Sequence, residues 1–412
     1  MLTTNRYWSL LRANPDFRRL YLAQLISFGG DWFLTVPLLG LIYEMTGSAV
    51  ATGAVLAVQS LPTFLMSPLA GMLADRLDRK TIMIAADLTR MGVVLGFLFV
   101  DDLGSPLLAF TLVALVAVGT AFFFPASSSA LPNLVEGRQL AEANILLGSA
   151  WGTMAAVGSA VGGTFAATVG RDAAFTVDAL TFLASAVLII RIRRPFAQQR
   201  PAHMPGFLAS AREAFDYART HPEVAALLTS KAGFGITAGA LVLLPVISFE
   251  LFGAGDRGTG VLFGARGLGA LMGPFLVKRF LGDDDRRLVG SIGPSIAAWG
   301  VCYALLSVAP TLGLAALAVW AAHMGGGNQW AMSTYGLQRV TPDFVRGRIF
   351  SFDFGLVMLS ISASYLVAGA LAERLGVQPV LIGAGAFAFL FGLTWRQLTN
   401  RYWAALEPVG PS

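Results

Sequence analysis

The chain has 412 residues, of which 55% are hydrophobic and only 13% are charged, and its net charge is +5. A soluble protein of this length needs a larger charged surface, so the composition excludes a globular soluble domain and indicates many membrane-spanning helices. The single cysteine, Cys302, excludes an intramolecular disulfide and a thiolate metal cluster.

Apolar runs long enough to cross a bilayer as helices follow one another along the whole chain. Short polar breaks separate them. The twelve runs cover residues 18–43, 49–73, 82–100, 106–131, 143–169, 173–194, 224–250, 257–281, 288–308, 311–337, 350–372 and 377–398. The residues before the first run carry no short apolar stretch with a small-residue cleavage site, so we expect no removable signal peptide.

Lysine and arginine concentrate in alternate breaks. Both termini and the breaks after the second, fourth, sixth, eighth and tenth runs hold 23 of the 29 basic residues. The opposite breaks hold only Arg171, Arg257 and Arg374. By the positive-inside rule, we expect a multi-pass protein of the cell membrane with both termini in the cytoplasm. Topology alone accounts for the basic charge, so the lipid bilayer is an expected partner and nucleic acid is not.

The chain divides near its midpoint. We expect a six-helix half over residues 1–194, a cytoplasmic linker over 195–222, a second six-helix half over 223–400 and a cytoplasmic tail over 401–412. Within the linker, apolar residues recur at helical spacing between 207 and 220, which predicts an amphipathic helix on the inner membrane surface. Proline, valine, glycine and arginine recur between 132–138 and 342–348, an internal repeat typical of transporter folds.

Two runs are rich in glycine, which allows close packing of helices in lipid. We expect both helices at crowded interfaces, most simply facing each other across the two halves. The fifth run contributes Gly148, Gly152, Gly158, Gly162 and Gly163, and the eighth contributes Gly269 and Gly273 among others.

The break after the second run carries five charges between Asp75 and Lys80. Its pattern, Gly71-x-x-x-Asp75-Arg76-x-x-Arg79-Lys80 with Asp78 in the turn, resembles the signature of the major facilitator superfamily. The segments 14–20, 30–32 and 340–348 extend the resemblance to the branch of drug:proton antiporters that holds macrolide efflux proteins and the enterobactin exporter. The resemblance implies an all-α membrane protein of twelve transmembrane helices in two pseudo-symmetric six-helix halves.

This sequence departs from the superfamily pattern at positions tied to proton coupling. The fourth run lacks a buried arginine that many proton-coupled members carry, and Ser159 stands where the antiporter motif places proline. These departures leave the commonest proton relay in doubt.

The resemblance also implies a conformational latch on the cytoplasmic side. Family geometry places the start of the eleventh helix, with Arg346 and Arg348, beside Asp75. In this hypothesis the latch comprises Gly71, Asp75, Arg76, Asp78, Arg79, Lys80, Asp87, Arg90, Arg346 and Arg348. The alternative is that these charges only fix the topology.

Several ionisable residues fall within apolar runs, where each needs a partner or water because burying a charge in lipid is costly. They are Asp31, Asp87, Arg90, Asp178, Lys231 and Arg266. Asp87 and Arg90 lie three apart and can pair locally. In the superfamily fold Asp31 and Lys231 face the central cavity, so Asp31 is a candidate proton carrier. The alternative is a permanent salt bridge of Asp31 with Lys231 or Arg266.

The tenth run contains the polar group His323, Asn328, Gln329 and Trp330, interrupted by three glycines at 325–327. Successive glycines weaken a helix, so we expect local unwinding there, with polar side chains entering a substrate cavity. His323 is either a proton carrier or a hydrogen-bonded structural residue.

Motifs for nucleotide, metal or nucleophilic chemistry are missing from the sequence, so neither an enzyme nor a bound cofactor is expected. The expected function is secondary active transport: efflux of a small amphiphilic molecule, such as a drug, macrolide or siderophore, driven by a proton gradient. The protein is expected to work as a monomer. An uptake symporter, a facilitator and a non-transporting membrane sensor remain as alternatives.

Overall fold

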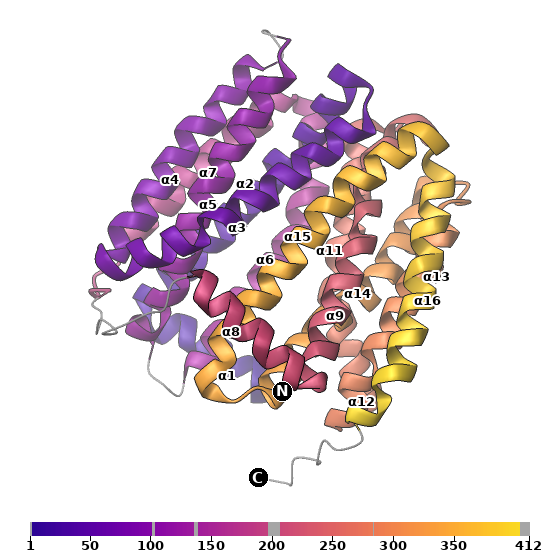
Figure 1. Cartoon of the computed structure of the whole chain (residues 1–412). Helices are drawn as coiled ribbons and strands as arrows, with labels where there is room; N and C mark the ends of the chain where they lie inside the picture. Colours follow the sequence, from indigo (N-terminus) through magenta and orange to yellow (C-terminus); the bar gives the residue numbers. More distant parts are fainter. Residues whose placement is uncertain (1, 101–103, 136–138, 197–206, 283, 404–412) are drawn as a thin grey trace. The chain divides into compact units, whose positions relative to one another are not determined.

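The computed structural model describes residues 2–100, 104–135, 139–196, 207–282 and 284–403. All regular elements within these ranges are helices (Figure 1). The chain forms two compact units. Unit 1 comprises residues 1–47, 58–202 and 254–264, and unit 2 comprises residues 48–57, 203–253 and 265–412.

The first half of the sequence forms a short helix and six long ones. The helices are α1 (Leu2–Ala13), α2 (Pro15–Thr46), α3 (Ala49–Arg76), α4 (Arg79–Leu95, continued by a 3-10 turn over Gly96–Phe99), α5 (Pro106–Leu134), α6 (Leu140–Val169) and α7 (Arg171–Ile190). Several begin at the capping signals that their sequences carry. Asn14, Asp78 and Ser105 each accept a hydrogen bond from a backbone N–H in the first turn of the helix that follows.

The predicted amphipathic linker helix is α8 (Phe207–Thr220). The second half then contains α9 (Pro222–Thr237), α10 (Leu243–Val246), α11 (Gly255–Leu281), α12 (Asp285–Gly290), α13 (Ile292–Leu306), α14 (Leu312–Val340), α15 (Asp343–Leu375) and α16 (Val377–Trp403). Short helices α10 and α12 are parts of longer helical stretches and not separate spans.

The helices confirm the predicted all-α membrane fold. Ten helical stretches among the described residues are long and apolar enough to cross a membrane. The other two predicted runs coincide with α3 and α14, which are 28 and 29 residues long. Each of the twelve runs therefore corresponds to a helical stretch.

Unit 1 is held together by apolar packing among its helices. Helix α2 packs against α6 and α7, and α4 packs against α5 and α7. Near the N-terminus, Leu10 of α1, Phe17 and Leu20 of α2, and Leu134 of α5 share one buried cluster with Ile192, which follows α7. This cluster anchors the short helix α1 to the bundle.

In unit 2, α13 lies between α14 and α16, and α9 packs against α15 (Figure 1). Two helices differ from the sequence-based prediction. Helix α14 runs without interruption through Gly325, Gly326 and Gly327, so the predicted unwinding is wrong. The seventh run is irregular instead, because it passes from α9 through a 3-10 segment (Ala238–Val242) and α10 into a π-helix (Ile247–Leu251).

The three glycines stay helical because neighbouring helices occupy the space that side chains would need. A Cβ at Gly325 would meet the backbone of Ser295, one at Gly326 the ring of Phe234, and one at Gly327 the backbone of Ala270. The glycines therefore allow close packing on three sides of α14.

Candidate transport sites

Unit 1 contains a buried ion pair within α4. Arg90 Nη2 donates a hydrogen bond to Asp87 Oδ1, and both residues are almost completely buried. The guanidinium carbon of Arg90 also lies 4.8 Å from the ring centroid of Phe123 and 4.2 Å from that of Phe182. Aromatic faces from α5 and α7 thus replace water around this cation.

Two further carboxylates belong to the same cluster. Asp178 of α7 is fully buried, accepts a hydrogen bond from Thr181 Oγ1 at 3.2 Å, and interacts electrostatically with Asp31 and Arg90. Asp31 of α2 is only half-buried and also interacts with Asp87. We call Asp31, Asp87, Arg90 and Asp178 the acidic cluster. It brings three carboxylates together with one guanidinium.

Unit 2 contains a second buried ion pair, between Lys231 of α9 and Asp353 of α15. Both residues are only 3% exposed. Lys231 Nζ also donates to Thr334 Oγ1 at 3.0 Å and lies 5.1 Å from the ring centroid of Trp330. A salt bridge of Lys231 with Asp31 was one of the alternatives from the sequence, and sequence reasoning missed Asp353.

Asp353 was missed because it lies close to the start of the predicted run 350–372, where a charge could equally belong to the preceding break. The structure begins α15 at Asp343, which puts Asp353 three turns inside the helix. The sequence did hold one signal for such a carboxylate, namely Lys231 itself. Burying its charge in the membrane is costly, so it required a carboxylate on a neighbouring helix.

The polar side chains of α14 make contacts with different neighbouring residues. His323 Nε2 is 3.0 Å from Tyr303 Oη, and the Tyr303 ring stacks on Trp299 at 3.9 Å between centroids. Asn328 Nδ2 donates to Ser291 Oγ at 2.8 Å and Ser295 Oγ at 2.9 Å. His323 and Asn328 therefore help to join α14 to the adjacent α12–α13 stretch.

The next two residues of α14 differ from these. Gln329 is completely buried, and within the described chain neither atom of its amide has a hydrogen-bond partner. Trp330 is 37% exposed. Arg266 of α11 interacts electrostatically with Tyr303, His323 and Tyr365. Gln329 thus has an amide without a partner among the described residues, and Trp330 offers a partly exposed ring beside Lys231.

The basic loop after α3 makes structural contacts within unit 1. Asp78 caps α4 by accepting hydrogen bonds from the backbone N–H groups of Lys80 and Thr81. Lys80 Nζ donates to the carbonyl oxygens of Ile190 at 2.9 Å and Ile192 at 2.8 Å, which neutralises the carboxyl end of α7. Arg79 Nη1 donates to Asn133 Oδ1 at 3.3 Å.

The other predicted latch residues are only partly described. Gly71, Asp75 and Arg76 belong to α3, but their surroundings lie outside the described part of the structure, as do those of Gly148. In unit 2, Arg346 Nε donates to the carbonyl oxygen of Thr341 at 3.1 Å, and Arg348 pairs with Glu213 of the linker helix α8.

An ion-pair network that sequence reasoning missed lies at the opposite ends of the unit 1 helices. Arg171 Nε donates to Asp256 Oδ2 at 2.7 Å and Nη2 to Oδ1 at 3.2 Å, while Nη1 donates to Glu44 Oε2 at 2.6 Å. The network joins α2 and α7 to the first turn of α11, which comes from the second half of the sequence. Arg171 is one of the few basic residues in the predicted outer breaks. Its rarity there was the signal in the sequence that could have pointed to this network.

The glycines of α6 and α11 lie at close helix contacts. In unit 1, a Cβ at Gly158 or Gly162 would meet α2, and one at Gly163 would meet Gly260 of α11. In unit 2, Gly269 and Gly273 face the backbone of α14 at Trp320 and Met324. Gly152 is buried within α6.

Comparison with known proteins agrees with this architecture. The family of transmembrane secretion effectors matches residues 6–408. The chain is 25% identical to the putative bacilysin exporter BacE of Bacillus subtilis strain 168, with 90% of each chain covered. It is 26% identical to macrolide efflux protein A of Streptococcus pyogenes, over 88% of this chain and 90% of that one.

A bacterial homologue of the human lysosomal transporter Spinster has a similar solved structure. Its TM-score is 0.72 at 14% sequence identity, with 96% of this chain and 98% of that chain covered, so it supports the fold alone. The match over nearly the whole chain shows the family. The protein belongs to the transmembrane secretion effectors of the major facilitator superfamily and is a multi-pass membrane transporter.

Proposed function

We propose that the protein exports a small amphiphilic molecule across the bacterial cell membrane in exchange for protons. Its relatives include an efflux protein and a putative exporter, which supports this direction of transport. The proposed substrate is a drug, a macrolide or a siderophore.

The acidic cluster of unit 1 is the observation that carries proton coupling. Arg90 balances only one of the three carboxylates, and two uncompensated negative charges inside a bundle of membrane helices are costly. Taking up a proton lowers that cost. Asp31 is the member that is only half-buried, whereas Asp87 and Asp178 are completely buried. Asp31 is therefore the group that exchanges a proton with water.

Unit 2 supplies the proposed substrate contacts. Gln329 offers an unpaired amide, Trp330 offers an aromatic face, and the Lys231–Asp353 pair offers both signs of charge. Few polar groups beside aromatic surface are typical of sites for amphiphilic ligands. A ligand that bonds to Gln329 would satisfy an amide that lacks partners among the described residues.

The outer ion-pair network supports alternating access. Rocking transporters open one side of the membrane at a time by separating helices from the two halves of the sequence. Arg171 and Asp256 come from different halves and bind each other bidentately. Opening on the predicted outer side therefore requires this pair to break.

The test uses a bacterial host that lacks its own efflux pumps. The wild-type protein is expected to raise the inhibitory concentration of at least one compound in a panel of macrolides and other small amphiphilic drugs, and a protonophore should abolish the increase. Asp31→Asn should abolish it too. The control, Asp172→Asn, removes an exposed carboxylate from α7 and should retain it.

Inside-out vesicles then separate coupling from folding. Addition of a transported compound should release protons in wild type and in Asp172→Asn, but not in Asp31→Asn present at equal amounts. Coupled transport that survives Asp31→Asn contradicts the assigned role of Asp31. Accumulation of the compounds inside intact cells would instead support the uptake alternative.

A further inference from the structure

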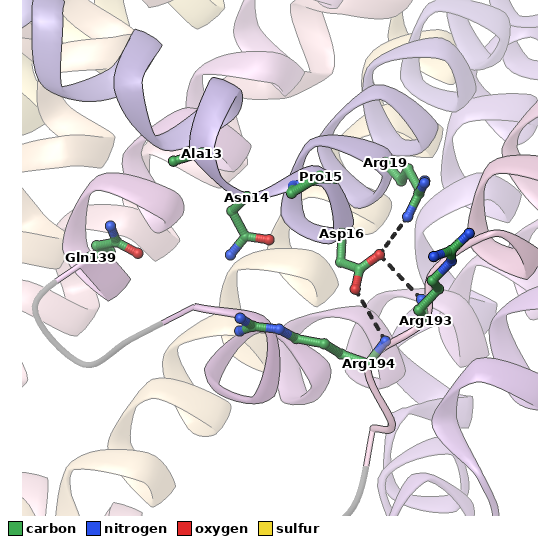
Figure 2. A pocket seen from close by; sticks show the side chains of 8 residues that line it. All are labelled: Ala13, Asn14, Pro15, Asp16, Arg19, Gln139, Arg193 and Arg194. Atoms are coloured by element: carbon green, nitrogen blue, oxygen red, sulfur yellow. Dashed lines mark hydrogen bonds and ion pairs between the residues drawn. The ribbon is translucent and has the colours of Figure 1, made fainter.

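A basic pocket lies at one end of unit 1, where α1, α2, α6 and the chain after α7 meet. Its volume is about 370 Å³, and it is lined by Ala13, Asn14, Pro15, Asp16, Arg19, Gln139, Arg193 and Arg194 (Figure 2). The segments that form it belong to the predicted cytoplasmic side. Neither the acidic cluster nor the predicted latch includes any of these residues.

Both oxygens of Asp16, the one carboxylate that lines the pocket, accept hydrogen bonds from other residues of the pocket. Asp16 Oδ1 accepts hydrogen bonds from Arg19 Nη1 at 2.6 Å and the backbone N–H of Arg193 at 3.1 Å, and Oδ2 accepts one from the backbone N–H of Arg194 at 3.1 Å. Asn14 Nδ2 and Arg194 Nη1 both donate to the carbonyl oxygen of Leu134, at 2.7 and 2.9 Å. Asp16 and Asn14 thus fix the start of α2 against the ends of α5 and α7.

The arginines are left with a charge excess and unused donors. Three arginines and one carboxylate line the pocket, which leaves two positive charges, and a guanidinium has five N–H donors. The Asp16 bonds to Arg193 and Arg194 use their backbone N–H groups, not their side chains. Both side chains are exposed, and they leave the backbone in different directions (Figure 2). The excess of positive charge suits a phosphate group, which a guanidinium binds through two parallel hydrogen bonds.

Helix α1, beside this pocket, carries residues typical of the membrane interface. Its Leu10 is buried in the unit 1 cluster, while Trp8 on the same helix is 56% exposed. The guanidinium carbon of Arg12 lies 5.2 Å from the Trp8 ring centroid. An exposed tryptophan beside arginine on a short helix is typical of the membrane interface.

We propose that the pocket binds the phosphate headgroup of an anionic phospholipid, such as phosphatidylglycerol, from the predicted cytoplasmic leaflet. Basic pockets between membrane helices on this side are suited to such headgroups. The bound lipid bridges Arg19 and the arginines that follow α7, and it anchors the start of the first membrane helix to the end of the sixth. Transport is not needed for this binding.

The test measures lipid binding to the full-length purified protein by native mass spectrometry. Phosphatidylglycerol should bind more tightly than phosphatidylcholine. The double variant Arg193→Gln/Arg194→Gln should weaken phosphatidylglycerol binding by at least about tenfold, because it removes two charge-assisted contacts. The control double variant, Arg191→Gln/Arg212→Gln, removes the same charge from exposed residues of the same predicted side and should bind as wild type does.

Further measurements distinguish a lipid from free phosphate as the ligand and control for misfolding of the variants. Arg193→Lys/Arg194→Lys keeps the charge and should lose only part of the affinity, because lysine cannot make the paired hydrogen bonds. Equal weakening in both glutamine doubles would show a diffuse charge effect and overturn the pocket. Equal binding of the two lipids would overturn the preference for an anionic lipid. Displacement of the lipid by millimolar inorganic phosphate would identify free phosphate as the ligand and overturn the lipid assignment.

Discussion

At the scale of single residues, the buried pair of Lys231 and Asp353 makes the sharpest prediction about stability. Asp353→Asn leaves a buried ammonium without its carboxylate, so we expect a loss of about 3–5 kcal/mol. A marked fall in the melting temperature of the detergent-purified protein should report it. Arg374→Gln, which removes an exposed charge from the same helix, should leave the melting temperature within about a degree of wild type.

The double variant Lys231→Met/Asp353→Leu distinguishes pairing from a role of Asp353 alone. Removing both charges eliminates the unpaired ion, so stability should return close to the wild-type value. A double variant no more stable than Asp353→Asn would contradict the pairing. If the pair also contacts substrate, this stable double variant should still fail to confer resistance.

The candidate sites could be predicted only in part at this scale. Asp31, Asp87, Arg90, Asp178 and Lys231 were identifiable because charges within apolar runs are costly and few. Their partners were not, since a partner is set by how helices are rotated and packed. Asp353 shows this limit, as does Arg171, whose carboxylate partners Glu44 and Asp256 are far away in the sequence.

At the scale of elements, alanine substitutions in α14 can decide whether its glycines serve close helix packing or helix flexibility. A Cβ added at Gly327 would lie 2.7 Å from Ala270 Cα, whereas one added at Gly313, in the first turn of the same helix, would meet nothing within 4 Å. We therefore expect Gly327→Ala to cost about 1–3 kcal/mol through overpacking. Gly313→Ala should be neutral or stabilise by up to about 1 kcal/mol, because alanine favours the helix.

Melting temperatures of the two alanine variants decide between the explanations. If Gly327 served to loosen the helix, both substitutions would stabilise the protein. The sequence predicted every long helix correctly, because apolar length is a local property. It placed the irregular segment in the wrong run, because glycine weakens an isolated helix but strengthens one whose neighbours approach closely.

At the scale of the whole molecule, we expect the network of Arg171, Asp256 and Glu44 to govern opening on the predicted outer side. Arg171→Gln removes every ion pair of the network, so the peptides that contain residues 40–47 and 255–260 should exchange backbone hydrogen faster in mass spectrometry. Arg257→Gln removes the neighbouring exposed charge and should not change the exchange. If Arg171→Gln leaves the protection from hydrogen exchange unchanged, the glycine contacts between α6 and α11 hold this region closed without the ion pairs.

The orientation of the molecule in the membrane is the last prediction. Basic residues resist translocation, so their concentration in alternate breaks predicts that both termini lie in the cytoplasm. In a Cys302→Ser background, Arg257→Cys should react with a membrane-impermeant maleimide in intact cells. Ser9→Cys and Arg401→Cys should react only after permeabilisation. Labelling of the two terminal cysteines from opposite sides would require an odd number of spans, and labelling of both in intact cells would invert the orientation. An odd number of spans would break the pairing of the two six-helix halves. An inverted orientation would remove the basic pocket from the cytoplasmic leaflet.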